Sequence, residues 1–159
     1  MFYVQRFQKK YSKSAIRFLK QCLPESGRIL DLDGRHKIYG DIDRYFECFW
    51  LLFDKKIIAG TVALKKIDNT RCELKALYLL ENFQEMGLGR MLLETAINEA
   101  KKQGDCKLFL DTLSTSEKAI RLYKKAGFIM TERYNENEFA DVFMVLKLKQ
   151  NGKDADVYE

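Results

Sequence analysis

The stretch that most constrains the fold runs from Glu73 to Gly104 and has the pattern of a strand, a short loop and a long helix. Tyr78-Leu79-Leu80 is an apolar run of strand length. The helix that follows carries its apolar side chains on one stripe at helical period, at Leu88, Leu92, Leu93, Ala96, Ile97 and Ala100. Gly104 suits the position just past the helix end. The stretch therefore predicts a strand, loop and helix with one buried helix face.

The loop between the predicted strand and helix has the composition of an anion-binding turn. Gly87 and Gly89 lack a Cβ and let a ligand approach the backbone closely, and Arg90 adds a positive charge. The first turn of a helix leaves backbone N–H groups unpaired and carries the positive end of the helix dipole, which suits a phosphate or pyrophosphate. A tight strand-to-helix turn without a ligand explains the two glycines equally well. The patterns G-x-x-x-x-G-K-[ST] and G-x-G-x-x-G are both absent, which argues against a P-loop NTPase and a dinucleotide-binding fold.

The loop resembles the Q/R-x-x-G-x-G/A motif of the GNAT family of N-acetyltransferases, matched here by Gln84, Gly87 and Gly89. The later run AIRLYKKAGF, residues 119–128, resembles the family's second motif, A-x-x-x-Y-x-x-x-G-F. The resemblance is strong over residues 49–128 and weaker toward both ends. It implies an α+β fold in which helices flank both faces of a mixed, mostly antiparallel sheet. It also implies acetyl transfer from acetyl-CoA to a primary amine by direct attack.

The resemblance further implies which residues hold coenzyme A. The strand backbone at Leu77 and Leu79 would pair with the pantetheine arm, although both side chains would be apolar core in almost any fold. Ser116 stands where many relatives have an asparagine that contacts the cofactor, so we expect weaker or water-mediated contact there. The predicted cofactor-binding set is Leu77, Leu79, Gln84, Glu85, Met86, Gly87, Leu88, Gly89, Arg90, Ser116 and Tyr123.

Two residues are candidates for the proton transfers of this reaction. The distance of Glu73 from Gln84 matches that of the general-base glutamate in the histone-acetylating branch of the family, acting directly or through water. The alternative is a rim glutamate paired with Lys75 or Arg71. Tyr123 holds the tyrosine position of the second motif, where the hydroxyl of many relatives lies near the coenzyme A sulfur and serves as the acid. The alternative is a core tyrosine with a satisfied hydroxyl.

Two further places are candidate parts of the site. His36 lies between Arg35 and Lys37, and we expect a solvated surface side chain rather than a second base. Tyr134, Asn135, Glu136 and Asn137 fall between the last predicted strands, where relatives often line the acceptor site, and a plain loop accounts for them equally well.

Composition bounds the class of protein. The chain has 159 residues, of which 47% are hydrophobic and 32% charged, with a net charge of +5, as expected for one soluble domain. The positive charge is too dispersed to predict nucleic-acid binding. No signal peptide is recognised, and the longest apolar run, Phe49 to Phe53, is too short to cross a membrane. We therefore expect a cytoplasmic protein that binds neither nucleic acid nor membrane.

The cysteines and the single histidine do not predict a metal site. Cys22, Cys48, Cys72 and Cys106 are widely spaced and form no C-x-x-C pair. Each lies in an apolar or strand-like context, so we expect buried thiols in a reducing compartment.

The predicted organisation is one acetyltransferase domain over residues 1–149 and a disordered tail over residues 150–159. Relatives often dimerise through their last strands, so a homodimer is compatible with the family. Two other functions remain open at this point. One is a catalytically silent acyl-CoA-binding module of the same fold, and the other is an interaction protein that uses the loop to bind a nucleotide.

Overall fold

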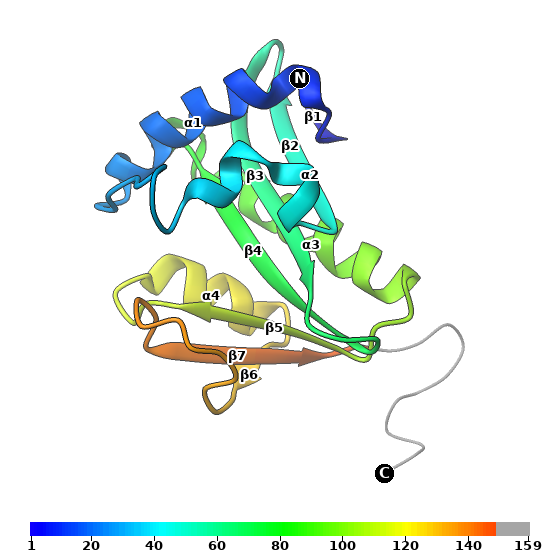
Figure 1. Ribbon diagram of the computed structural model, residues 1–159. Coiled ribbons are helices and arrows are strands. Elements are labelled where there is room, and N and C mark those ends of the chain that lie inside the picture. Colours follow the sequence, from blue (N-terminus) through cyan, green and yellow to red (C-terminus); the bar gives the residue numbers. More distant parts are fainter. Residues whose placement is uncertain (149–159) are drawn as a thin grey trace. The chain divides into compact units, whose positions relative to one another are not determined.

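The computed structural model describes residues 1–148 and has the α+β architecture that the sequence predicts (Figure 1). The strands are β1 (Phe2–Arg6), β2 (Cys48–Asp54), β3 (Ile57–Lys66), β4 (Arg71–Leu79), β5 (Lys107–Thr112), β6 (Ile129–Met130) and β7 (Val142–Lys147). The helices are α1 (Ser12–Glu25), α2 (Ile42–Tyr45), α3 (Leu88–Lys102) and α4 (Glu117–Lys125), with 3-10 turns η1 (Lys9–Tyr11), η2 (Lys37–Gly40) and η3 (Glu81–Phe83). The predicted tail, residues 150–159, lies outside the described residues.

The seven strands pair in the order β1-β2-β3-β4-β5-β7-β6. β4 pairs with β5 in parallel over Arg71–Glu73. The ladders of β1 with β2, β2 with β3, β5 with β7 and β6 with β7 are antiparallel. The prediction of a mixed, mostly antiparallel sheet is therefore confirmed.

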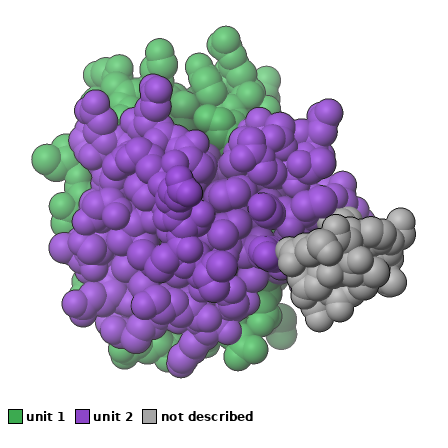
Figure 2. All heavy atoms as spheres, turned by 90° about the horizontal axis from the view of Figure 1, so that it is seen from below, with its two compact units in different colours: residues 1–65, 75–96 green, residues 66–74, 97–159 purple. Residues whose placement is uncertain are grey.

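The chain divides into two compact units, which Figure 2 shows in different colours. Unit 1 comprises residues 1–65 and 75–96, and the described part of unit 2 comprises residues 66–74 and 97–148. The expectation of a single domain over residues 1–149 stays a prediction.

Unit 1 builds its core from an apolar strand and the helices that cover its two faces. Residues 48–53 of β2 are all buried, because they lie between helices on both faces, with α1 and α2 on one side and the start of α3 on the other (Figure 1). The buried face of α1 consists of Ala15, Phe18, Leu19, Cys22 and Leu23, at helical spacing. On the other side, a Cβ at Gly60 of β3 would come within 3.0 Å of the Leu92 Cδ1 atom of α3. Glycine at this position therefore permits close packing of helix on strand.

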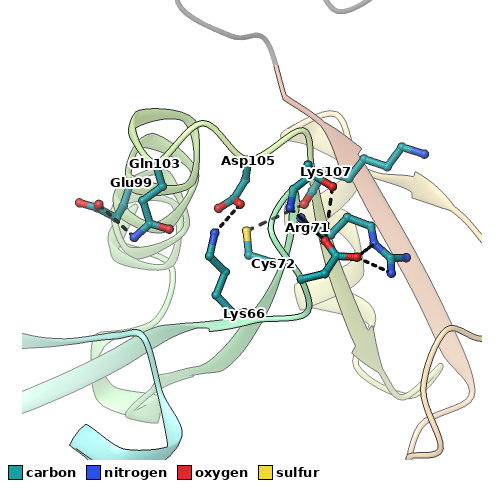
Figure 3. A network of polar contacts seen from close by, with 9 residues as sticks. Lys66, Arg71, Cys72, Glu99, Gln103, Asp105 and Lys107 are labelled. Carbon is teal, nitrogen blue, oxygen red and sulfur yellow. Dashed lines mark hydrogen bonds and ion pairs between the residues drawn. The ribbon is translucent and has the colours of Figure 1, made fainter.

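At one end of unit 2, polar contacts join the end of β3, the start of β4 and the turn between α3 and β5 (Figure 3). The Lys66 ammonium lies 2.9 Å from the Asp105 carboxylate, whose side chain is 0% exposed. The Cys106 N–H donates to the Thr70 carbonyl at 2.7 Å. These contacts hold the turn after α3 against the start of β4 and so set where β5 begins.

Three local signals in the sequence predict helix ends: Ser12 as the cap of a first helix, Pro24 as its end, and Ser114 with Glu117 as the capping box of a later helix. All three predictions were wrong. Ser12 does not cap α1, since it is the first helical residue and its hydroxyl donates to the Lys9 carbonyl at 2.8 Å. Pro24 does not end α1, which continues to Glu25 and stops where Gly27 adopts a φ of 77°. Ser114 and Glu117 do not form a capping box. Ser114 instead binds the Asp141 carboxylate through both its N–H and its hydroxyl.

Two further expectations need correction. The apolar run from Tyr45 to Phe53 predicts a strand that begins at Tyr45. Tyr45 instead ends the single turn of α2, since the Phe46 N–H donates to the Ile42 carbonyl at 3.0 Å, and β2 begins at Cys48. Cys106 is exposed, because it lies in the turn before β5, whereas the other three cysteines are buried as predicted.

Candidate active site

The Gln84–Gly89 loop lies in unit 1 between η3 and α3. Glu85 and Gly87 both have positive φ, 63° and 78°, which turns the chain sharply into the helix. The Gln84 side chain folds back, and its Nε2 donates to the Leu79 carbonyl at 3.4 Å. Residues 84–87 are exposed, while Leu88 is buried and anchors the first helical turn. The loop backbone is therefore open to solvent and fixed at both ends.

The electrostatics of this loop suit an anion. The Met91 N–H donates to the Gly87 carbonyl at 3.1 Å, so the N–H groups before it in the first turn of α3 have no acceptor within the helix. Arg90 pairs with Glu94 one turn along at 2.9 Å, with 77% of its side chain exposed. Such exposed pairs contribute only about 0.3–0.5 kcal/mol, so Arg90 can exchange this partner for a phosphate at little cost. The residues present therefore fit the diphosphate of coenzyme A.

A kink in β4 separates two groups of candidate site residues on this strand. Ala76 has a φ of 53° within the strand, a left-handed conformation that is unusual for a residue with a Cβ. Its carbonyl accepts a buried hydrogen bond of 2.7 Å from the Thr61 hydroxyl of β3, which stabilises the kink. Glu73 precedes the kink, whereas Leu77 and Leu79 follow it and are half-buried. No pattern in the sequence indicates this kink.

Glu73 is buried in unit 2, with only 7% of its surface exposed. Its Oε2 atom accepts hydrogen bonds from the Tyr134 hydroxyl at 2.5 Å and from the Asn135 Nδ2 at 3.1 Å. Arg71, suggested as a partner for Glu73, instead pairs with Asp68 at 2.7 Å. The glutamate is therefore a buried, hydrogen-bonded carboxylate and not one on an exposed rim.

A second carboxylate joins this group. The Asn135 Nδ2 also donates to Asp111 Oδ2 at 2.6 Å. Burial raises the pKa of the Tyr134 hydroxyl, and the negative charge of Glu73 and the hydrogen bond to it raise it further. Tyr134 is therefore a proton-bearing donor at neutral pH. Sequence reasoning assigned Tyr134 and Asn135 no contact with Glu73, and no local signal could have done so across 61 and 62 residues.

Tyr123 lies in α4 and Ser116 directly precedes this helix, both in unit 2. Tyr123 is 6% exposed, and its ring packs on that of Phe128 with centroids 5.8 Å apart. Ser116 is the N-cap residue of α4, but its side chain makes no capping hydrogen bond. Its carbonyl accepts the Ile120 N–H at 3.0 Å, which begins the helix.

The structure thus groups the predicted site residues in two sets. Unit 1 holds the loop and strand residues, namely Leu77, Leu79, Gln84, Glu85, Met86, Gly87, Leu88, Gly89 and Arg90. Unit 2 holds Glu73, Ser116 and Tyr123, and there it brings Glu73 together with Tyr134, Asn135 and Asp111.

His36 is buried, and the expectation of a solvated surface histidine was wrong. Its Nδ1 accepts the Asp31 N–H at 2.9 Å, and its ring stacks on Tyr39. Burial and the charge of Arg35 lower the pKa of His36, which favours the neutral imidazole that this hydrogen bond requires.

Within residues 1–148, no group of three or more His, Cys, Asp and Glu side chains is arranged to hold a metal ion. Within the same residues, no helix has the length and apolar character needed to cross a lipid bilayer.

Comparison with known proteins decides the family. The profile of the acetyltransferase (GNAT) family matches residues 13–128 of this chain. The chain belongs to the GNAT family.

This GNAT chain is 30% identical over 138 residues to a probable N-acetyltransferase, san, of Drosophila melanogaster, covering 81% of the chain and 74% of that protein. It is 41% identical over 80 residues to an uncharacterized N-acetyltransferase of Dictyostelium discoideum, covering 49% of the chain and 37% of that protein. For this and another of the first curated relatives, the matched part spans only about two fifths to half of the relative's length.

Solved structures agree on the fold. An acetyltransferase of the GNAT family from Staphylococcus aureus superposes on this GNAT chain with a TM-score of 0.85 at 22% identity, covering 94% of the chain and 100% of that protein. A putative acetyltransferase from Salmonella typhimurium, solved with its cofactor acetyl-CoA, gives a TM-score of 0.71 at 19% identity, covering 95% and 96%. At these identities the likeness concerns the fold.

Proposed function

We propose that this chain transfers an acetyl group from acetyl-CoA to a primary amine. The observation that carries the proposal is the Gln84–Gly89 loop, which places a solvent-open backbone turn with Gly87 at φ 78° before the fifteen-residue helix α3. This arrangement suits a diphosphate, and it coincides with the motif of the GNAT family to which the chain belongs.

The proposed roles follow the two sets of site residues, the first in unit 1 and the second in unit 2. In the first, the backbone of Gln84–Gly89 and the Arg90 side chain bind the diphosphate, and the backbone of Leu77 and Leu79 pairs with the pantetheine arm. In the second, Ser116 makes a polar contact to the cofactor. We assign Glu73 as the base and Tyr123 as the acid.

The proposed reaction balances as follows. The acceptor nitrogen attacks the thioester carbonyl, so that a C–N bond forms and the C–S bond breaks. The Glu73 carboxylate takes the proton from the nitrogen, directly or through water, and the departing thiolate takes a proton from the Tyr123 hydroxyl. Glu73 and the tyrosine regain their starting states by exchange with solvent.

The acceptor, the location and the oligomeric state stay predictions. One solved relative in fold is the ribosomal-protein-S18-alanine N-acetyltransferase from Escherichia coli, which matches with a TM-score of 0.75 at 20% identity and covers 97% of the chain and 98% of that protein. A peptide amine and a small-molecule amine are both candidates for this chain. We retain the expectation of a cytoplasmic protein, and a homodimer is compatible with the family.

The first test is a calorimetric titration with acetyl-CoA, with ATP and NAD as control ligands. We expect a dissociation constant near the micromolar range, about −8 kcal/mol, and no heat from the controls. Binding of ATP or NAD in preference to acetyl-CoA would instead support the nucleotide-binding alternative.

A matched pair of glycine variants sharpens this test. A Cβ added at Gly87 or at Gly40 would meet no atom within 4 Å, but only Gly87 has a positive φ. We expect Gly87→Ala to weaken acetyl-CoA binding about tenfold, because an L-residue in the left-handed region costs about 1–2 kcal/mol and shifts the loop. Gly40→Ala is the control and should bind normally. Equal binding by the two variants would mean that the loop is only a turn.

Turnover separates the enzyme from a silent binding module. The wild-type chain is assayed with acetyl-CoA and a panel of amino acids, polyamines, aminoglycosides and peptide N-termini, with product detected by mass spectrometry. Binding of acetyl-CoA without transfer to any of them would favour the silent acyl-CoA-binding module.

A further inference from the structure

The segment between β6 and β7 is braced by its own hydrogen bonds. The Arg133 guanidinium donates to the carbonyls of Asn137 at 2.9 Å and Ala140 at 3.1 Å, and it lies over the Phe143 ring at 4.5 Å. The Asn137 side chain accepts the Phe139 N–H at 3.0 Å. This bracing fixes the position of the two residues that follow Arg133, which are Tyr134 and Asn135.

The ring of Tyr134 is held between two phenylalanines. Its centroid lies 4.9 Å from that of Phe109 on β5 and 5.7 Å from that of Phe143 on β7, the latter edge to face. These contacts direct the hydroxyl to Glu73 on β4, where it donates to Oε2 at 2.5 Å. A bond this short to an anionic acceptor is of the strong, charge-assisted kind.

The orientation of the Asn135 amide is determined by its partners. Its Oδ1 accepts the Asn137 N–H at 3.1 Å, so its Nδ2 faces the carboxylates of Glu73 and Asp111. Asn135 therefore supplies Glu73 with a second donor and links it to Asp111. Both donors end on the same oxygen, Oε2, and so fix its position.

We propose that Tyr134, assisted by Asn135, is a positioning residue for Glu73 in the acetyl-transfer reaction, a role that rests on the function proposed above. The Tyr134 hydroxyl and the Asn135 Nδ2 both donate to the Glu73 Oε2 atom from the segment between β6 and β7. On its own strand, Arg71 is turned to Asp68 and to the Phe109 ring. The Tyr134 hydroxyl thus keeps the Glu73 carboxylate oriented for the proton transfer.

The substitution Tyr134→Phe tests this role, because it removes the hydroxyl and leaves a ring to pack between Phe109 and Phe143. We expect kcat/KM to fall about tenfold or more, with little change in the affinity for acetyl-CoA. The loss should fall on kcat, with KM for the amine changed less than about twofold, because the hydroxyl orients the base and does not itself bind the substrate.

A matched control exists in unit 1. The ring of Tyr39 is likewise buried between two phenylalanines, Phe46 and Phe49, but its hydroxyl faces the Tyr78 hydroxyl at 3.5 Å instead of a carboxylate. Tyr39→Phe should leave kcat unchanged. A loss of equal size in both variants would mean that Tyr134→Phe acts through packing, and the positioning role would be refuted.

A double-mutant cycle with Glu73→Gln decides whether Tyr134 acts through Glu73. If it does, Tyr134→Phe should change kcat/KM less than about twofold in the Glu73→Gln background, because the residue that it positions is already disabled. Losses that multiply in full in the double variant would refute the positioning role.

One measurement checks the contact without relying on activity. In a chain with 13C-labelled tyrosine ring carbons, the assigned Tyr134 signal should differ between the wild type and Glu73→Gln, because the substitution replaces the carboxylate that accepts its hydroxyl. A chain that shows this difference but acetylates no amine would refute the transferase function and the positioning role with it. An active wild type in which the Tyr134 signal does not differ from that in Glu73→Gln would refute the positioning role alone.

Discussion

At the scale of single residues, Tyr123 has the most specific role in the proposed mechanism, that of the acid. Tyr123 packs its ring on Phe128, so Tyr123→Phe should preserve the fold while removing the hydroxyl. We expect kcat to fall about 10²-fold or more, the usual contribution of a positioned acid, while acetyl-CoA binding measured by calorimetry stays within about twofold. Tyr11→Phe is the control, since Tyr11 also packs on a phenylalanine, Phe53, but lies outside the site. An unchanged kcat in Tyr123→Phe would remove its hydroxyl from the mechanism.

The environment of a residue could be predicted where the local periodicity determines it. It could not be predicted where a partner distant in the sequence determines it. All six apolar positions of the α3 stripe are buried, as their spacing predicts. His36 is flanked by charges in the sequence, yet its ring is buried because the Asp31 N–H turns back to it. Ser114 had the spacing of a cap, but the Asp141 carboxylate, 27 residues away, binds it instead. Helical patterns relate residues three or four positions apart. They therefore do not reveal the contacts of His36 and Ser114, whose partners lie farther along the chain.

At the scale of elements, the ends of β3 and α3 are joined by one ion pair. Lys66 ends β3, and Asp105 follows α3 with its carboxylate fully buried (Figure 3). Lys66→Met should lower the free energy of unfolding by about 1–3 kcal/mol, less than for a fully buried pair because 40% of the Lys66 side chain is exposed. The measurement is urea denaturation followed by circular dichroism.

The neighbouring lysine provides the control for that experiment. Lys65 is exposed on the same strand, and Lys65→Met should change the stability by less than about 0.5 kcal/mol. Equal stability of the two variants would show that the Lys66–Asp105 pair does not hold β3 to the turn after α3.

The elements of the site were predicted better than its contacts. The strand, loop and helix around Gln84–Gly89 follow from an apolar run, two glycines and a helical stripe, and all three are present. The kink at Ala76 could not be predicted, because alanine has no preference for a positive φ and the Thr61 hydroxyl that stabilises it comes from another strand. The link from Tyr134 to Glu73 likewise depends on how β4, β5 and β7 align.

At the scale of the whole molecule, the boundaries of the two units predict how the chain unfolds. They fall inside continuous elements, between Lys65 and Lys66 in β3, between Leu74 and Lys75 in β4, and between Ala96 and Ile97 in α3. Melting one unit alone would interrupt two strands and a helix in mid-course, and helices and small domains resist such partial states because their hydrogen bonds form cooperatively. We therefore expect a single unfolding transition, in line with one domain over residues 1–149.

Two local probes can test this cooperativity. Trp50, the only tryptophan, is buried in β2 of unit 1, and Met144 is fully buried in β7 of unit 2. Tryptophan fluorescence and the 13C-methyl signal of Met144 should give the same urea midpoint within error, because each probe would report the same event. Circular dichroism on the same samples provides the reference for the whole chain. Two separated midpoints would show that the units unfold independently, and the single-domain prediction would then be wrong.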